Sequence, residues 1–274
     1  MNPKLKSFIL WVFAFVFTLV IAIYQRMTGP TYPERAKVTI GQIEYKFHLL
    51  RTYDGADDAK IRLYVPDTSI RGEFKFRRFK SYDDWTMIGM ARHGDTLLGC
   101  LPHQPPAGKM MFSVTLLKDG TRYLVHAEPT VLRYKGYVPL GILIPHIIII
   151  FLAMLFSTRA GLEVLFRGKY TFLYTWLTII FLFFGGLLLG PIVQKFSFGV
   201  YWAGWPLGHD LTDNKSIVAF IFWVVALIIQ YRNREKKLWA VIASVIMLVV
   251  FLIPHSALGS EIDYTKTSKV ENTK

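Results

Sequence analysis

Five apolar stretches, interrupted by one polar block at residues 25–136, most constrain what this chain can fold into. The stretches are Phe8–Tyr24, Tyr137–Phe156, Phe172–Leu189, Ile217–Ile229 and Leu238–Ile253. A helix rises about 1.5 Å per residue, so about twenty apolar residues cross a hydrocarbon layer about 30 Å thick. The pattern predicts an α+β membrane protein with five transmembrane helices and one exported domain inserted between the first and second helices.

The apolar stretches divide the chain into four expected parts. Residues 1–24 predict an N-terminal transmembrane anchor, and residues 25–136 predict the exported domain. Residues 137–254 predict a four-helix transmembrane domain with an aromatic outer-face loop at 190–215. The last residues, 255–274, are rich in Thr, Ser, Lys, Glu and Asn, a composition typical of a disordered tail.

Positive charge is unevenly distributed among the segments beside the apolar stretches. The chain carries 32 Lys and Arg against 19 Asp and Glu, a net charge of +13. The N-terminus, the second-to-third connection and the fourth-to-fifth connection together hold nine basic and two acidic residues, hence +7. Because basic flanks of membrane helices stay in the cytoplasm, we expect a cytoplasmic N-terminus and an extracytoplasmic domain and C-terminus.

The polar block alternates apolar and polar residues, as in Ile43–Leu49, Lys60–Val65 and Gly72–Arg77. Such alternation is typical of strands with one buried face. About nine short strands, including one at Trp85–Ala91, are separated by turn signals such as Asp119-Gly120. The spacing predicts an immunoglobulin-like β-sandwich. Its basic residues alternate with apolar ones or lie near acids, so we expect no nucleic-acid partner.

A weak copper signal lies within this domain at Met87, Met90 and His93. Thioether and imidazole groups are ligands that copper prefers. Residues three apart fall on opposite faces of a strand, however, so the interval alone does not bring them together. We favour core packing for these side chains and expect no metal there.

The tetrapeptide Leu-Ile-Pro-His occurs twice, ending at His146 and at His255. His146 lies well inside the second apolar stretch, where an ionisable group is costly and marks a functional site or a buried partner. Paired histidines on two membrane helices are what haem b or a metal ion requires. Hydrogen bonding to a neighbouring helix is the alternative, and we treat His146 only as a candidate intramembrane ligand.

The connection at 190–215 has two parts. Its first part is too rich in Gly and Pro for a helix, and its Trp and Tyr residues are typical of a membrane interface. Its second part mixes imidazole, carboxylate and amide groups before the fourth stretch. We hypothesise an outer-face polar site for metal binding or acid–base chemistry, with helix capping as the alternative. The candidate residues are His209, Asp210, Asp213 and His255.

The segment Phe198–Lys215, with Gly204-Trp205-Pro206 and Gly208-His209-Asp210 at its centre, resembles a segment found in bacterial multi-pass membrane proteins without an assigned function. The resemblance covers this segment well and the rest of the chain only in outline, and it implies a bacterial membrane protein. It assigns no catalytic role to any residue.

No phosphate-binding glycine loop, Gly-x-Ser-x-Gly elbow or His-Glu-x-x-His helix occurs in the sequence. We therefore expect a binding or assembly protein rather than an enzyme. Its expected partners are the lipid bilayer and another membrane or periplasmic protein, with a protein or envelope ligand at the β-sandwich. One alternative is a redox or metal-handling protein that binds haem b, copper or zinc near the outer face. Another is a membrane enzyme acting there on a lipid-linked or envelope substrate.

Overall fold

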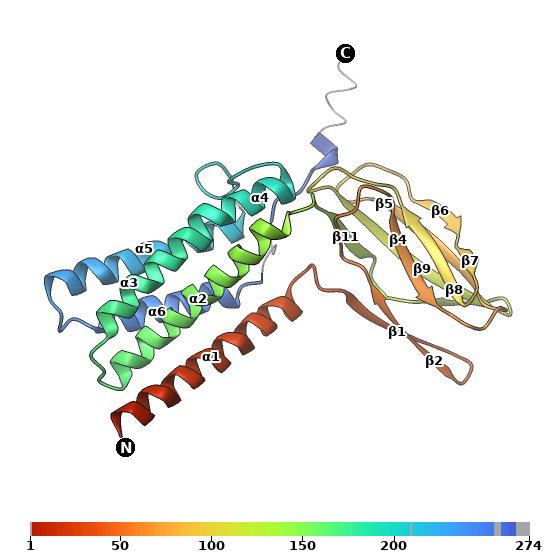
Figure 1. Cartoon of the computed structure of the whole chain (residues 1–274). Helices are drawn as coiled ribbons and strands as arrows, with labels where there is room; N and C mark the ends of the chain where they lie inside the picture. The colour runs from red at the N-terminus through yellow and green to blue at the C-terminus, as the bar shows by residue number, and fades with distance from the viewer. Residues whose placement is uncertain (1, 209, 255–258, 267–274) are drawn as a thin grey trace, which may run out of the picture. The chain divides into compact units, whose positions relative to one another are not determined.

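The computed structural model describes residues 2–208, 210–254 and 259–266. Within these ranges the chain is α+β, with six α-helices and eleven β-strands (Figure 1). The chain divides into two compact units. The helical unit comprises Met1–Pro30 and Val138–Ser260, and the β unit comprises Thr31–Tyr137 and Glu261–Lys274.

The helices of the helical unit run in alternating directions, except that α3 and α4 belong to one continuous helix (Figure 1). They are α1 (Pro3–Thr28), α2 (Leu140–Leu165), α3 (Thr171–Leu182), α4 (Gly190–Phe198), α5 (Leu211–Arg232) and α6 (Leu238–Leu252). Among the described residues, four helices are long and apolar enough to cross a membrane: α1, α2, the continuous helix Thr171–Phe198, and α5. The fifth apolar stretch forms α6, which has 15 residues and is therefore shorter than the other four.

The helical unit packs through small side chains. Helix α2 contacts α1, α3 and α6, and α5 contacts α3 and α6. Fully buried alanines on α2, α5 and α6 allow these helices to approach closely. The largest fully buried side chain is that of Trp223, whose Nε1 donates to Met247 Sδ at 3.2 Å. The buried alanines are Ala153, Ala160, Ala219, Ala226, Ala240 and Ala243.

The expectation of irregular chain at the start of 190–215 is wrong, because Gly190–Phe198 is helical. A π-helical segment at Phe183–Leu189 joins α3 to α4, and the Gly190 N–H bonds to the Gly185 carbonyl oxygen. This register shift places Pro191 in the first turn of α4, where a missing N–H is tolerated. Helix α4 ends at Gly199, whose φ of 83° suits glycine.

The β unit has three sheets that share one hydrophobic core. Strands β1 and β2 form a hairpin, β3-β11-β9-β5-β6 follow one another in a larger sheet to which β10 adds, and β4-β8-β7 form the third. The immunoglobulin-like classification stays a prediction. The strands are β1 (Glu34–Ile40), β2 (Ile43–Leu49), β3 (Thr52–Tyr53), β4 (Ala59–Tyr64), β5 (Arg71–Arg78), β6 (Thr86–Gly89), β7 (Ala91–His93), β8 (Thr96–Leu101), β9 (Lys109–Lys118), β10 (Thr121–Leu124) and β11 (Thr130–Tyr134).

The single strand expected at Trp85–Ala91 is divided between two sheets, which corrects that prediction. Strand β6 pairs with β5, whereas β7 pairs with β8. Between them Met90 donates its N–H to the Gly72 carbonyl oxygen at 2.7 Å and buries its side chain. A Cβ on Gly72 would lie 2.7 Å from Met90 Sδ. The chain crosses between sheets here because Gly72 leaves room for Met90.

Candidate functional site

The predicted outer-face site lies partly outside the described residues, because it includes His209 and His255. Asp210 and Asp213, its other members, are buried at the N-terminus of α5. Asp210 Oδ1 accepts the Thr212 N–H at 2.8 Å, and its Oδ2 accepts the N–H and hydroxyl of Ser260 at 2.9 and 3.1 Å. Asp210 thus caps α5 and also holds the chain that follows α6.

Asp213 organises the loop that precedes α5. Its Oδ2 accepts the N–H groups of Ala203 and Gly204 at 2.7 and 3.1 Å. Asn214 Oδ1 accepts the next N–H, that of Trp205, at 2.6 Å. Both carboxylates therefore accept main-chain N–H groups, but only Asp210 caps α5, whereas Asp213 holds the loop before it. Within the described ranges, no three His, Cys, Asp or Glu side chains are placed to hold a metal ion.

His146, the candidate intramembrane ligand, contacts the π-helical segment. Its Nδ1 lies 3.0 Å from the Gly185 carbonyl oxygen, the same oxygen that accepts the Gly190 N–H. Because a carbonyl only accepts, His146 Nδ1 carries a proton in this contact. The imidazole therefore joins α2 to the register shift between α3 and α4. This is the hydrogen-bonding role that the sequence left as an alternative to ligation.

The weak copper candidates occupy different surroundings. Met87 is 57% exposed on β6, and Met90 is buried in the core. His93 is exposed on β7, in the sheet to which β6 does not belong. Core packing accounts for Met90 alone.

Sequence reasoning missed a buried ion pair within α2, since Arg159 and Glu163 were counted among the charges of a connection. They are 1% and 4% exposed and form an ion pair one turn apart. The Arg159 guanidinium lies over the rings of Trp11 and Tyr174, at 5.5 and 5.0 Å from their centroids. Glu163 Oε1 also accepts the Tyr170 N–H at 3.0 Å. The four-residue spacing of opposite charges was the available signal.

Sequence reasoning also missed an ordered segment, Glu261–Lys266, which we call the C-terminal strap. It belongs to the β unit and is bonded to Thr31–Tyr137, so the expected disorder of 255–274 is wrong for these residues; 255–258 and 267–274 fall outside the described ranges. Glu261 forms ion pairs with Lys80 and Lys109. The Ile262 N–H bonds to the Ala107 carbonyl oxygen, and the Thr265 N–H bonds to that of Lys80, each at 3.2 Å.

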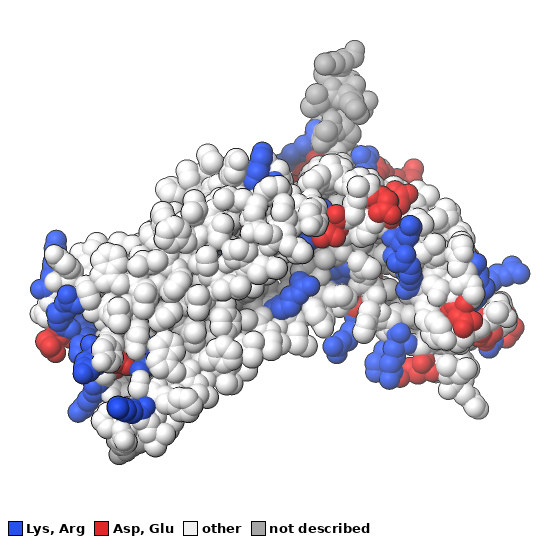
Figure 2. Space-filling view, viewed as in Figure 1, with Lys and Arg blue, Asp and Glu red and all other residues white. Residues whose placement is uncertain are grey.

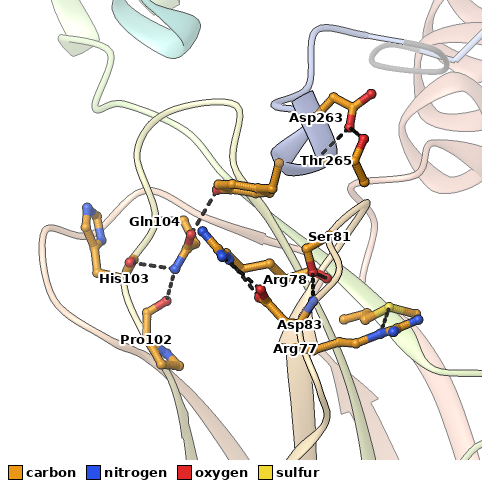
Figure 3. Close-up of polar contacts among 11 residues, drawn as sticks. Arg77, Arg78, Ser81, Asp83, Pro102, His103, Gln104, Asp263 and Thr265 are labelled. Carbon is orange, nitrogen blue, oxygen red and sulfur yellow. Dashed lines mark hydrogen bonds and ion pairs between the residues drawn. The ribbon is translucent and has the colours of Figure 1, made fainter. Parts of the chain in front are cut away.

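Tyr264 anchors the strap and is 8% exposed. Its hydroxyl donates to Gln104 Oε1 at 2.8 Å, and the Arg78 guanidinium lies 4.6 Å from its ring centroid. Asp83 binds Arg78 through two hydrogen bonds of 2.7 and 2.8 Å (Figure 3). Burial raises the pKa of the Tyr264 hydroxyl, so it stays a donor at neutral pH.

The charges beneath the strap are coupled. Burial lowers the pKa of Lys109, while the hydrogen bond to Glu261 opposes this shift. Burial alone would raise the pKa of Glu261, but hydrogen bonds from Lys109 and Lys80 hold it below its ordinary value. Glu261 is therefore a carboxylate at neutral pH, and it neutralises a half-buried cationic position.

The edge strand β6 and its surroundings form a further surface of interest. All four residues of β6 are exposed, and none is charged. Just before β6, the Trp85 ring lies near two cations of β5, with Lys75 Nζ at 4.6 Å and the Arg77 guanidinium at 4.8 Å from its centroid.

Comparison of the chain with protein-family models and with curated proteins finds no match.

Proposed function

We propose that this chain is an integral protein of the bacterial plasma membrane that presents its β unit outside the cytoplasm to a protein or envelope ligand. The four long apolar helices support membrane insertion. Lys and Arg gather at the end of the helical unit that carries the α2–α3 and α5–α6 connections, and few charges lie over its middle (Figure 2). By the positive-inside rule this end faces the cytoplasm. Burial of Arg159 with Glu163 leaves that bias unchanged, because their charges cancel.

The C-terminal strap supports a fifth crossing by α6. The strap contacts the β unit, so the segment after α6 lies on the same side of the membrane as the domain between α1 and α2. Three crossings, by α2, Thr171–Phe198 and α5, separate that domain from the α5–α6 connection. An odd number of crossings places the connection on the opposite side. Helix α6 must then cross to return the chain to the strap.

The shortness of α6 is compatible with this crossing. Fifteen residues span about 22 Å at about 1.5 Å per residue. Lys215 Nζ donates to the Ile253 carbonyl oxygen at 2.8 Å, and Gln25 Nε2 donates to that of Phe251 at 2.5 Å. These side chains satisfy carbonyl groups at the end of α6, so this end need not reach water.

The observation that carries the binding proposal is the exposed edge of β6. Strand β6 is the edge strand of the larger sheet, and its Met87 and Ile88 are apolar and exposed. An uncharged apolar edge is a template on which a segment of another chain adds as a strand. The neighbouring Trp85 with Lys75 and Arg77 combines aromatic and cationic groups, which favours a partner with acidic residues.

Site-specific photo-crosslinking in cells tests this proposal. A photoreactive residue at Met87 should yield one discrete crosslinked product. The matched control is Ile43, which is apolar and 55% exposed at the β1–β2 turn. Ile88→Lys should abolish the Met87 product, because a lysine on a strand edge blocks strand addition. Equal crosslinking from Met87 and Ile43, or an unchanged product in a folded Ile88→Lys chain, would contradict the proposal.

A further inference from the structure

We propose that the surface beneath the C-terminal strap is a peptide-binding site of the β unit. It recognises an acidic residue followed three positions later by tyrosine, and Glu261–Lys266 occupies it in cis. The site involves other side chains than the β6 edge and does not depend on the partner proposed for that edge.

The acidic position is defined by two lysines around one carboxylate. Lys109 lies on β9 with its side chain 18% exposed, and Lys80 follows β5. Arg133 and Lys80 both act on Lys109 as like charges. Without a carboxylate at the position of Glu261, Lys80 and the partly desolvated Lys109 would lose the acid that both contact. The site is therefore built to receive an anion.

The tyrosine position is a socket with a prepared acceptor. The Gln104 amide donates to the carbonyl oxygens of His103 and Pro102 at 2.9 and 3.3 Å, which directs Oε1 at the Tyr264 hydroxyl (Figure 3). A Cβ on Gly108 would lie 2.7 Å from that hydroxyl oxygen, so glycine leaves room for the hydroxyl here. Phenylalanine has no hydroxyl and would leave Gln104 Oε1 without a donor, so the site selects tyrosine over phenylalanine.

Main-chain contacts set the spacing between these positions. The N–H groups of Ile262 and Thr265 bind carbonyl oxygens of the β unit. Asp263 Oδ1 accepts the Thr265 N–H at 3.1 Å and its hydroxyl at 2.5 Å, which holds the segment in a turn. The site thus contacts the acidic side chain, the tyrosine ring and the main chain of the bound segment, as do sites that recognise short peptides.

Covalent attachment makes the strap a strong competitor. A tethered segment acts at an effective concentration of about millimolar, so a modest intrinsic affinity keeps it bound. A separate peptide of the same chemistry therefore binds only when the strap is absent or released. This gives a direct prediction for the free peptide.

The experiment measures binding of a fluorescent peptide with the sequence Ser260–Lys266 to detergent-purified protein. A chain that ends at Ser260 should bind it saturably, and the complete chain should bind at least about tenfold more weakly. Glu261→Lys or Tyr264→Phe in the peptide should each weaken binding about tenfold. Lys109→Ala in the shortened chain should have the same effect. The control is Lys37→Ala, at an exposed lysine of β1, which should leave binding unchanged.

A complete chain with Glu261→Lys and Tyr264→Ala provides a second empty site if the shortened chain does not fold. The proposal is overturned if a folded chain with an empty site fails to bind the peptide, or binds a scrambled peptide equally well. It is also overturned if neither chain folds, because the strap is then a structural part of the β unit.

Discussion

Lys215 Nζ donates a hydrogen bond to the backbone carbonyl oxygen of Ile253 at 2.8 Å. Ile253 follows the last residue of α6, and Lys215 lies in the first turns of α5. The same carbonyl oxygen accepts the side-chain amide of Gln25 from α1 at 3.2 Å. Three helices are therefore joined at one main-chain group. The contact replaces the water that a helix end normally requires.

Replacing Lys215 by methionine tests the value of this junction. Lys215→Met keeps an unbranched side chain only one atom shorter and removes its donor, so we expect a loss of about 1–3 kcal/mol in the free energy of unfolding. The measurement is the unfolding midpoint of the detergent-purified chain. Lys236→Met, at an exposed position in the α5–α6 connection, is the control. Equal midpoints for the two variants would contradict the structural role of Lys215.

The buried pair Arg159–Glu163 predicts a strong coupling. Arg159→Met should lower the free energy of unfolding by about 3–5 kcal/mol, because it leaves the Glu163 carboxylate buried without its cation. Adding Glu163→Met should recover part of this loss. The recovery should be incomplete, since Glu163 also accepts the Tyr170 N–H. A double-mutant cycle measures the coupling, and strictly additive losses would show that the pair is not a unit.

The local features of the β unit were predictable from the sequence. Alternation in Ile43–Leu49 is visible along the chain, and β2 has these bounds. The hairpin at Asp119-Gly120 is confirmed, with φ of 49° and 78° at these residues. Both signals are local, because strand alternation and turn conformation depend on neighbouring residues.

The features that were missed depend on residues far apart in the chain. The break at Met90 depends on the space left by Gly72, and the strap depends on Lys80 and Lys109, which precede Glu261 by more than a hundred residues. The π-helical register at Gly185 is supported by His146 from another helix. At the candidate site, the sequence indicated a capping residue before α5 but assigned that role to Thr212, Asp213 or Asn214, whereas the structure has Asp210 as the cap. The bonds from Asp210 to Ser260 were not predicted either.

Acidification should release the strap. Hydrogen bonds from Lys109 and Lys80 hold the pKa of Glu261 below its ordinary value of 4.5, against the effect of burial. Because the pKa of Glu261 is lower in the docked state, ionised Glu261 stabilises docking fully at a pH above its ordinary pKa. This stabilisation is lost as the pH falls through the lowered pKa. We expect docking to be constant from neutral pH down to the ordinary pKa of 4.5 and to weaken only below it.

An environment-sensitive fluorophore on Lys266→Cys, in a Cys100→Ser background, reports strap release. The only native cysteine is thereby removed, and the new one is exposed at the last residue of the strap. The matched variant Glu261→Gln should release the strap already at pH 7 and remove the acid transition. If the acid transition persists in Glu261→Gln, a group other than Glu261 causes the release, and the prediction is wrong.

The same cysteine-free background tests the five-crossing topology. Single cysteines at Tyr82 in the β unit, Glu235 in the α5–α6 connection and Lys266 in the strap are all at exposed positions. If α6 crosses, a membrane-impermeant maleimide should label Tyr82→Cys and Lys266→Cys in intact cells, and Glu235→Cys only after permeabilisation. Labelling of Glu235→Cys in intact cells would reverse the proposed orientation. Protection of Lys266→Cys together with labelling of Tyr82→Cys would place the strap and residues 31–137 on opposite sides of the membrane. That result would contradict the docking of the strap.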